Sequence, residues 1–106
     1  MSEWIYLAIA IIFEVAGTTS MKLSDGFSKL APSIAMSVFY IASITALTIA
    51  LKKIDMSMAY AIWAGVGTAL ITIIGLFVFK EELSVLKVVS IFLIILGVVG
   101  LHLSNK

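Results

Sequence analysis

Cysteine is absent from this 106-residue sequence, and histidine occurs once, as His102. A chain without cysteine has no disulfide framework and no thiolate ligands for a metal ion. A single histidine at the end of the last apolar segment does not make a zinc site either. We therefore predict no metal site, no redox role and no bound cofactor.

Charged residues are also scarce, at 12% of the chain against about 25% in soluble domains. The formal net charge is +1, and the seven basic residues, all lysines, are scattered over short polar segments. Such a weak and dispersed charge provides no basic surface for a nucleic acid. We expect no nucleic acid among the partners of this chain.

The chain is instead rich in long apolar runs. Hydrophobic residues make up 62% of the sequence, and the mean hydropathy is +1.22. The four runs cover residues 4–21, 31–51, 56–79 and 84–103. Each is close to the ~20 residues that a helix needs to cross about 30 Å of hydrocarbon. The sequence therefore predicts an all-α membrane protein, with residues 1–106 forming one domain of four transmembrane helices.

The connections between the runs are only a few residues long. Consecutive helices must therefore be antiparallel neighbours, and any binding site must lie between helices, surrounded by membrane lipid. The first run is preceded by Glu3 rather than by a basic stretch, and three further spans follow it. We expect it to be a retained span and not a signal peptide.

Glu14 is the only ionisable residue deep inside any of the four runs. A carboxylate at the centre of a bilayer costs roughly 2.5 to 3.5 kcal/mol on insertion scales, so it usually serves a function. Desolvation disfavours its charged form, whereas a bound cation favours it. Protons and cations would therefore compete for Glu14, which we predict to be a binding site for both.

Small residues surround Glu14 on its helical face, where they leave room for a ligand or for a close neighbouring helix. The residues on this face are Leu7, Ala10, Ile11, Gly17, Thr18 and Met21. We predict that Ala10, Ile11, Gly17 and Thr18 line a substrate cavity. The alternative is a protonated Glu14 that only holds helices together through a hydrogen bond.

Aromatic residues with polar tips recur in the second and third runs. Tyr40 and Ser43 are three residues apart in the second run, while Tyr60 and Trp63 share a stripe of the third. Such rings could form an interfacial belt, but Trp63 lies about 10 Å along its helix, which is deep for a belt position. An electron-rich ring near a carboxylate suits a bulky organic cation. We predict that these four residues contact substrate.

Small residues also mark the third and fourth runs. Gly65 and Gly67 lie close together, where they allow either close packing or a flexing point. We predict a hinge there, beside the aromatic stripe. Ser90 and Gly97 are one heptad apart in the fourth run and predict a helix-pairing surface. A dimer joined through this run would enclose a cavity that four helices alone enclose poorly.

The lysines fall almost equally on the two sides of the predicted membrane. One side carries Lys22, Lys29, Lys80 and Lys87, and the other carries Lys52, Lys53 and Lys106. Because loop lysines set orientation by staying in the cytoplasm, so weak a bias predicts insertion in both orientations. Two opposed copies would supply an inverted repeat. A single orientation with a weak signal is the alternative.

Together, these residues resemble the small multidrug resistance transporters, four-helix bacterial exporters of cationic compounds. The resemblance runs from Trp4 to about Ser104, and its most specific parts are Glu14 with Gly17, Thr18, Thr19 and Lys22, the loop Ser24–Phe27, and the run AYAIWAGVG from Ala59 to Gly67. The family implies an antiparallel, dual-topology homodimer in the bacterial inner membrane, with the substrate cavity between the subunits. It implies a transporter, not an enzyme, that exchanges protons for organic cations.

By this resemblance Glu14 is the shared proton and substrate carboxylate, Trp63 and Tyr60 contact substrate, and Tyr40 lies nearby. The guanidinium exporters of the family tend to have Gly and Trp where this chain has Ile11 and Gly17, so the chain looks like the quaternary ammonium branch. A guanidinium exporter, one half of a heteromeric exporter and a non-transporting membrane subunit are the alternatives. Ser90 departs from the Gly that is often found there, which puts the dimer affinity in doubt.

Overall fold

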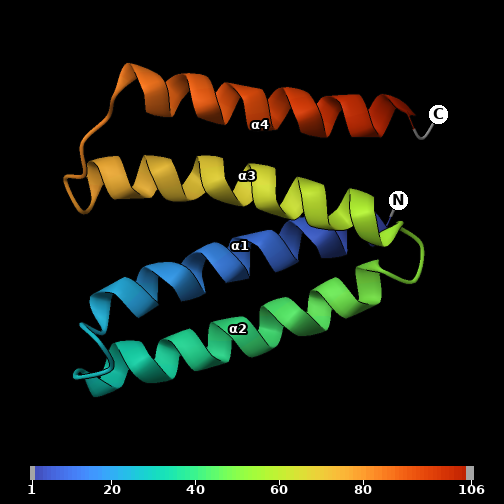
Figure 1. Cartoon of the computed structure of the whole chain (residues 1–106). Helices are drawn as coiled ribbons and strands as arrows, with labels where there is room; N and C mark the ends of the chain where they lie inside the picture. Colours follow the sequence, from blue (N-terminus) through green and yellow to red (C-terminus); the bar gives the residue numbers. More distant parts are fainter. Residues whose placement is uncertain (1, 105–106) are drawn as a thin grey trace. The chain divides into compact units, whose positions relative to one another are not determined.

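The structure is a computed structural model that describes residues 2–104, so Lys106 of the predicted topology lies outside the described residues. The regular structure of the described residues is α-helical. The helices are α1 (Ser2–Leu23), α2 (Leu30–Ala50), α3 (Met56–Phe77) and α4 (Val85–Ser104) (Figure 1). The prediction of an all-α chain with four helices able to span a membrane is confirmed, and each end lies within two residues of the predicted one.

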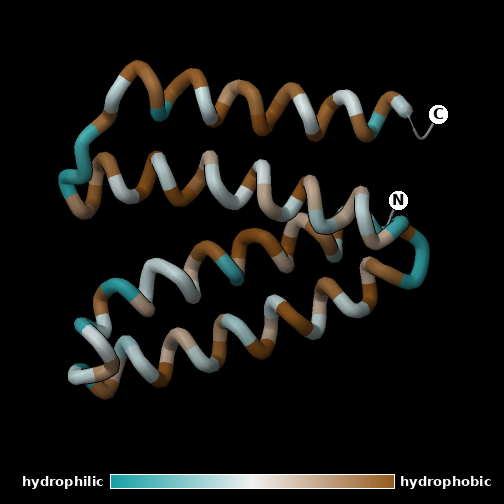
Figure 2. The backbone as a smooth tube through the Cα atoms, in the orientation of Figure 1, coloured by the Kyte–Doolittle hydropathy of each residue, from teal (hydrophilic) through white to brown (hydrophobic). Residues whose placement is uncertain are grey.

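The helices have 20 to 22 residues, which corresponds to about 30 Å at 1.5 Å per residue. Figure 2 shows that hydrophilic residues gather in the connections and at the helix ends, while apolar residues cover most of the helix length. In hydrocarbon a helix satisfies every backbone hydrogen bond internally, which is why apolar runs of this length fold as helices. The chain is a multi-pass membrane protein.

The described chain divides into two helical hairpins at the boundary between Ile54 and Asp55. In the first hairpin α1 and α2 run antiparallel (Figure 1). Ala10 on α1 and Ala46 on α2 are buried. Small side chains such as these let two membrane helices approach closely. That the two hairpins form one four-helix domain stays a prediction.

Ser24 organises the connection between α1 and α2. Its side chain is buried, its hydroxyl donates to the carbonyl of Met21 at 2.7 Å, and the hydroxyl accepts from the amide of Phe27 at 3.1 Å. Asp25, Gly26 and Phe27 all have positive φ angles, between 50° and 70°. Gly26 adopts this left-handed backbone without strain. Because Asp25 and Phe27 adopt it as well, the chain reverses direction in a tight turn. The single proline, Pro32, lies in the first turn of α2, where its missing amide costs no helical bond.

In the second hairpin α3 and α4 meet at Gly65. A Cβ on Gly65 would lie only 2.8 Å from Cγ2 of Val98, so the missing side chain admits α4. Ser84 starts α4 as an N-cap, since its hydroxyl accepts from the amide of Lys87 at 3.0 Å. No residue of α4 is buried within the described chain. The second hairpin is therefore the more loosely packed of the two.

Candidate functional site

Glu14 lies near the middle of α1, where its carboxylate is hydrogen-bonded and partly exposed. Oγ1 of Thr18, one helical turn further on, donates to Oε2 of Glu14 at 2.7 Å. The same Oγ1 lies 2.7 Å from the hydroxyl oxygen of Tyr40 on α2. The structure thus brings together three of the predicted site residues, Glu14, Thr18 and Tyr40, in one continuous chain of hydrogen bonds.

Gly17 makes the approach of Tyr40 possible. A Cβ at this position would lie 2.8 Å from Cδ1 and Cε1 of the Tyr40 ring, closer than real side chains come. The ring therefore lies against the bare backbone of α1, and from there its hydroxyl reaches Thr18. Beside it, the rings of Phe13 and Phe39 stack at 6.0 Å between centroids. Small and aromatic side chains together position the polar ones.

The sequence interpretation missed the Phe13–Phe39 pair. Each phenylalanine directly precedes a predicted site residue, Glu14 and Tyr40 respectively. This adjacency could have indicated that the two phenylalanines flank the site, because consecutive residues of a helix point in neighbouring directions. It does not by itself show that the two rings meet.

Ser43 is placed differently from Tyr40. Its side chain is 1% exposed, and its hydroxyl donates to the backbone carbonyl of Ala10 at 2.6 Å. Ala10 and Ile11 are also buried. The hydroxyl of Ser43 therefore holds α2 to α1 in this structure, and substrate contact by these three residues stays a prediction.

We expect Ser43→Ala to lower the free energy of unfolding by about 1 kcal/mol, the usual contribution of one buried hydrogen bond, also within membranes. The measurement is the unfolding of the purified protein in mixed micelles with increasing sodium dodecyl sulfate. Ser37→Ala is the matched control, because the Ser37 hydroxyl is exposed and donates only to the carbonyl of Ser33 in its own helix. Unchanged stability with a loss of cation affinity would contradict the packing role.

Trp63 and Tyr60 lie on α3, in the second hairpin. Their ring centroids are 6.5 Å apart, with the planes tilted by 53°. Tyr60 is 69% exposed, and Trp63 is partly exposed. The two residues form an exposed or partly exposed aromatic pair, and a contact with a cation requires such access. Their place next to Glu14 stays a prediction.

The remaining predicted residues also lie in the second hairpin. Gly65 and Gly67 are buried, and α3 continues through both as a regular helix. Ser90 and Gly97 are exposed on α4, and apart from the neighbouring residues and backbone of α4 itself, no described heavy atom lies within 4 Å of where a Gly97 side chain would begin. The face that carries Ser90 and Gly97 is thus open, while the hinge and the pairing surface stay predictions.

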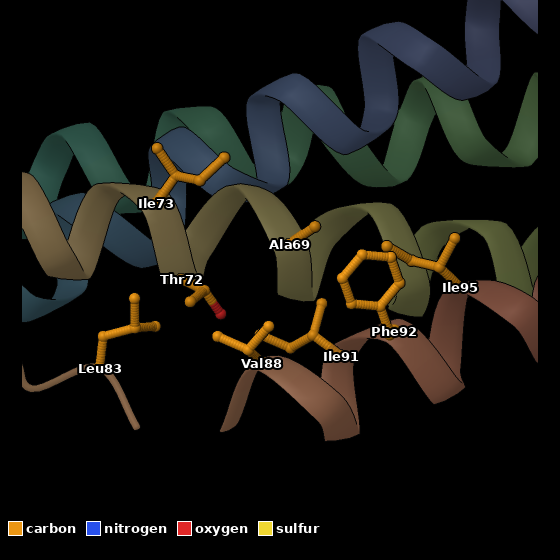
Figure 3. Close-up of a pocket in the computed structure, with 8 residues that line it drawn as sticks. All are labelled: Ala69, Thr72, Ile73, Leu83, Val88, Ile91, Phe92 and Ile95. Atoms are coloured by element: carbon orange, nitrogen blue, oxygen red, sulfur yellow. The ribbon is translucent and has the colours of Figure 1, made fainter. Parts of the chain in front are cut away.

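A groove of about 200 Å³ opens within the second hairpin (Figure 3). It is lined by Ala69, Thr72, Ile73, Leu83, Val88, Ile91, Phe92 and Ile95. The lining contains no charged side chain, and the hydroxyl of Thr72 donates to its own helix at the carbonyl of Thr68. A groove of this chemistry has nothing to balance the charge of a cation. The candidate cation site is therefore Glu14 and its hydroxyl partners.

The sequence profile of the Small Multidrug Resistance protein family matches residues 2–94, which include Glu14, the first connection and the aromatic stripe of α3. The chain belongs to the small multidrug resistance family. This confirms the resemblance that the motifs around Glu14 and Trp63 indicated. The match also covers α1 to α3 in full, together with the first half of α4.

Several known bacterial proteins are similar to this chain over almost its whole length. The uncharacterized membrane protein YvaE of Bacillus subtilis is 57% identical over 101 residues, which are 95% of this chain and 85% of the relative. The multidrug resistance protein EbrB of the same species is 46% identical over 105 residues, 99% of this chain and 90% of the relative. The quaternary ammonium compound-resistance protein QacE of Escherichia coli is 40% identical over 106 residues, 100% of this chain and 96% of the relative.

Proposed function

We propose that this small multidrug resistance protein is a proton-coupled antiporter that exports hydrophobic and quaternary ammonium cations across the bacterial inner membrane. The observation that carries the proposal is the carboxylate of Glu14, partly exposed in the middle of an apolar helix. The names of EbrB and QacE support a multidrug exporter, because both denote resistance proteins and one of them names quaternary ammonium compounds.

The exchange follows from the chemistry of one carboxylate. A bound organic cation stabilises the charged form of Glu14, and a proton removes that charge, so each weakens the binding of the other. Glu14 would be accessible from one side of the membrane at a time. If the protein switches between the two sides mainly when a ligand is bound, the entry of protons drives the exit of cations. Trp63 and Tyr60 then supply ring faces to the same cation.

The working unit in this proposal is an antiparallel homodimer of dual topology. The exposed face of α4 with Ser90 and Gly97 is the surface through which two copies would pair. Helices α1 to α3 of both copies would then line the cavity between the subunits. Gly65 and Gly67 would supply the flexing point of α3 during the change of side.

Gly17 favours the quaternary ammonium branch over the guanidinium exporters. The ring of Tyr40 occupies the space that a side chain at this position would need. A tryptophan at this position would occupy the same space and would displace that ring. The packing of Tyr40 against Gly17 therefore supports the quaternary ammonium branch.

The experiment that tests the proposal measures transport currents in proteoliposomes that contain only this protein. Tetraphenylphosphonium, a benzalkonium compound and guanidinium are compared under an imposed proton gradient, with protein-free liposomes as the control. We expect saturable currents with the two bulky cations and none with guanidinium. A response to guanidinium alone would assign the other branch, and silence with every cation would indicate an unlike partner or a non-transporting role.

A further inference from the structure

Thr18 lies between two hydrogen-bonding partners and has a single proton to donate. Its Oγ1 donates to Glu14 Oε2 at 2.7 Å and lies 2.7 Å from the Tyr40 hydroxyl oxygen. A threonine hydroxyl has one proton and two lone pairs, so it must accept from Tyr40 whenever it donates to Glu14. The hydrogen bonds therefore all point in one direction, from Tyr40 through Thr18 to the carboxylate.

The two carboxylate oxygens of Glu14 have different surroundings. Oε2 accepts from Thr18, whereas Oε1 accepts no hydrogen bond from the described residues of the first hairpin, 2–54. Glu14 and Tyr40 are both partly exposed. A cation can therefore approach Oε1 while Oε2 stays bonded to Thr18, and Tyr40 offers the hydroxyl at the far end of the hydrogen-bonded chain.

We propose that Tyr40 and Thr18 form a proton wire to Glu14. Protons reach and leave Oε2 through the two hydroxyls, while the cation binds on the side of Oε1. The wire deepens the proposed antiport and rests on it. It assigns the proton and the cation separate routes to one carboxylate, so that the cation does not have to leave before the proton can move.

The proton transfer balances in a single concerted shift. A hydronium ion gives a proton to the Tyr40 oxygen, the Tyr40 proton moves to Thr18, and the Thr18 proton moves to Oε2. Three O–H bonds break and three form, the hydronium becomes water, and Glu14 becomes neutral. Every hydrogen bond then points the other way, from Glu14 to Tyr40, without movement of the oxygen atoms. Release of the proton is the reverse shift.

No charged side chain on the packed helix competes for the proton. Between Leu30 and Ala50, α2 contains no Asp, Glu, Lys, Arg or His. The other charged residues of α1, Glu3 and Lys22, lie at its two ends. A proton that enters at Tyr40 therefore has Glu14 as the acceptor within reach of the hydroxyl chain.

The wire depends on the bare backbone at Gly17. Because a Cβ there would lie 2.8 Å from two ring carbons of Tyr40, Gly17→Ala must push the ring away from α1. The bond between Tyr40 and Thr18 would be lost, while the bond within α1 between Thr18 and Glu14 would stay. Gly17→Ala therefore interrupts the wire without removing any of its hydroxyls.

The test is the rate of proton release after the protein in detergent is mixed with saturating tetraphenylphosphonium, followed in a stopped-flow instrument with a pH-sensitive dye. We expect Thr18→Val, Tyr40→Phe and Gly17→Ala to slow the release about tenfold. This is less than the ~100-fold or more that a positioned proton-transfer group can contribute, since water replaces part of the route. The number of protons released per bound cation should stay that of wild type.

Two further variants separate the wire from general effects on structure. Thr18→Ser keeps a hydroxyl at the central position and should restore most of the rate. Thr19→Val is the matched control, because the Thr19 hydroxyl donates to the carbonyl of Val15 in its own helix at 2.8 Å. It removes a threonine hydroxyl from the next position of α1, and we expect the rate of wild type.

Wild-type release rates in both Thr18→Val and Tyr40→Phe would overturn the wire and leave the antiport intact. Altered cation affinity without slower release would also overturn it, because a purely structural role predicts that result. A wild-type protein that binds tetraphenylphosphonium and releases no proton would overturn the antiport itself, and the wire with it. If Thr18→Val does not fold, Tyr40→Phe decides, since it keeps the ring that packs against Gly17.

Discussion

We expect Glu14→Gln to abolish proton-coupled export of every cation. This is the largest effect that we predict for any variant. The amide has nearly the shape of the carboxyl group, but it neither gains a proton nor balances the charge of a cation. Thr18 can still donate to the amide oxygen, so the hairpin of α1 and α2 should fold. The measurement is the proton-driven tetraphenylphosphonium current in proteoliposomes, which we expect to fall to the level of protein-free liposomes.

Glu82→Gln is the matched control for this change. Glu82 is exposed in the connection between α3 and α4, outside the membrane spans, so the same chemical change there should leave the current intact. Glu14→Asp keeps the charge but draws it back toward the helix, and we expect weakened coupling rather than a complete loss. Proton-coupled export that persists in Glu14→Gln would refute the assignment of Glu14 as the shared site.

We expect Trp63→Ala to weaken the binding of aromatic and quaternary cations, which is the second large effect. A desolvated contact between a cation and an aromatic face contributes roughly 2 kcal/mol. That free energy corresponds to a dissociation constant roughly thirtyfold higher. Tyr60, whose ring centroid lies 6.5 Å from that of Trp63, remains in place and limits the loss. The measurement is equilibrium binding of tetraphenylphosphonium and a benzalkonium compound to purified protein.

Trp63→Phe and Trp4→Ala serve as controls for this prediction. Phenylalanine keeps a smaller ring face, so we expect an intermediate affinity. Trp4 lies in the first turn of α1, at the membrane boundary, and its replacement should leave cation affinity unchanged. Unaltered affinity of Trp63→Ala for several cations, at a normal protein level, would contradict the placement of Trp63 in the cavity.

The contact between Thr18 and Glu14 could be predicted from the sequence, but the contact with Tyr40 could not. Residues four apart on a helix lie on the same face, and the Thr18 hydroxyl indeed lies 2.7 Å from the carboxylate. Tyr40 reaches the same hydroxyl from another helix, and that contact depends on how α2 is rotated and how closely it approaches. Gly17 sets the approach, because a side chain there would exclude the ring.

The surroundings of Ser43 could not be predicted from the sequence either. Its spacing of three residues from Tyr40 suggested that both side chains line one cavity. The structure instead buries Ser43 with its hydroxyl on the carbonyl of Ala10, while Tyr40 bonds to Thr18. Side chains three apart differ by about 60° around a helix axis. One of the two side chains can therefore be buried against a neighbouring helix while the other is not. Which one is buried depends on the position of that helix.

The sequence by itself determined the number of spans, their length and the isolation of one carboxylate among them. These properties are local, because a helix in hydrocarbon forms wherever about 20 apolar residues follow one another. The tertiary structure alone decided that Tyr40 reaches the Thr18 hydroxyl beside Glu14, and that Ser43 bonds to the carbonyl of Ala10. It also decided that, within the described residues of the first hairpin, only Oε2 of Glu14 accepts a hydrogen bond. Such pairings depend on distances between helices, and these arise from the packing of small side chains from distant parts of the chain.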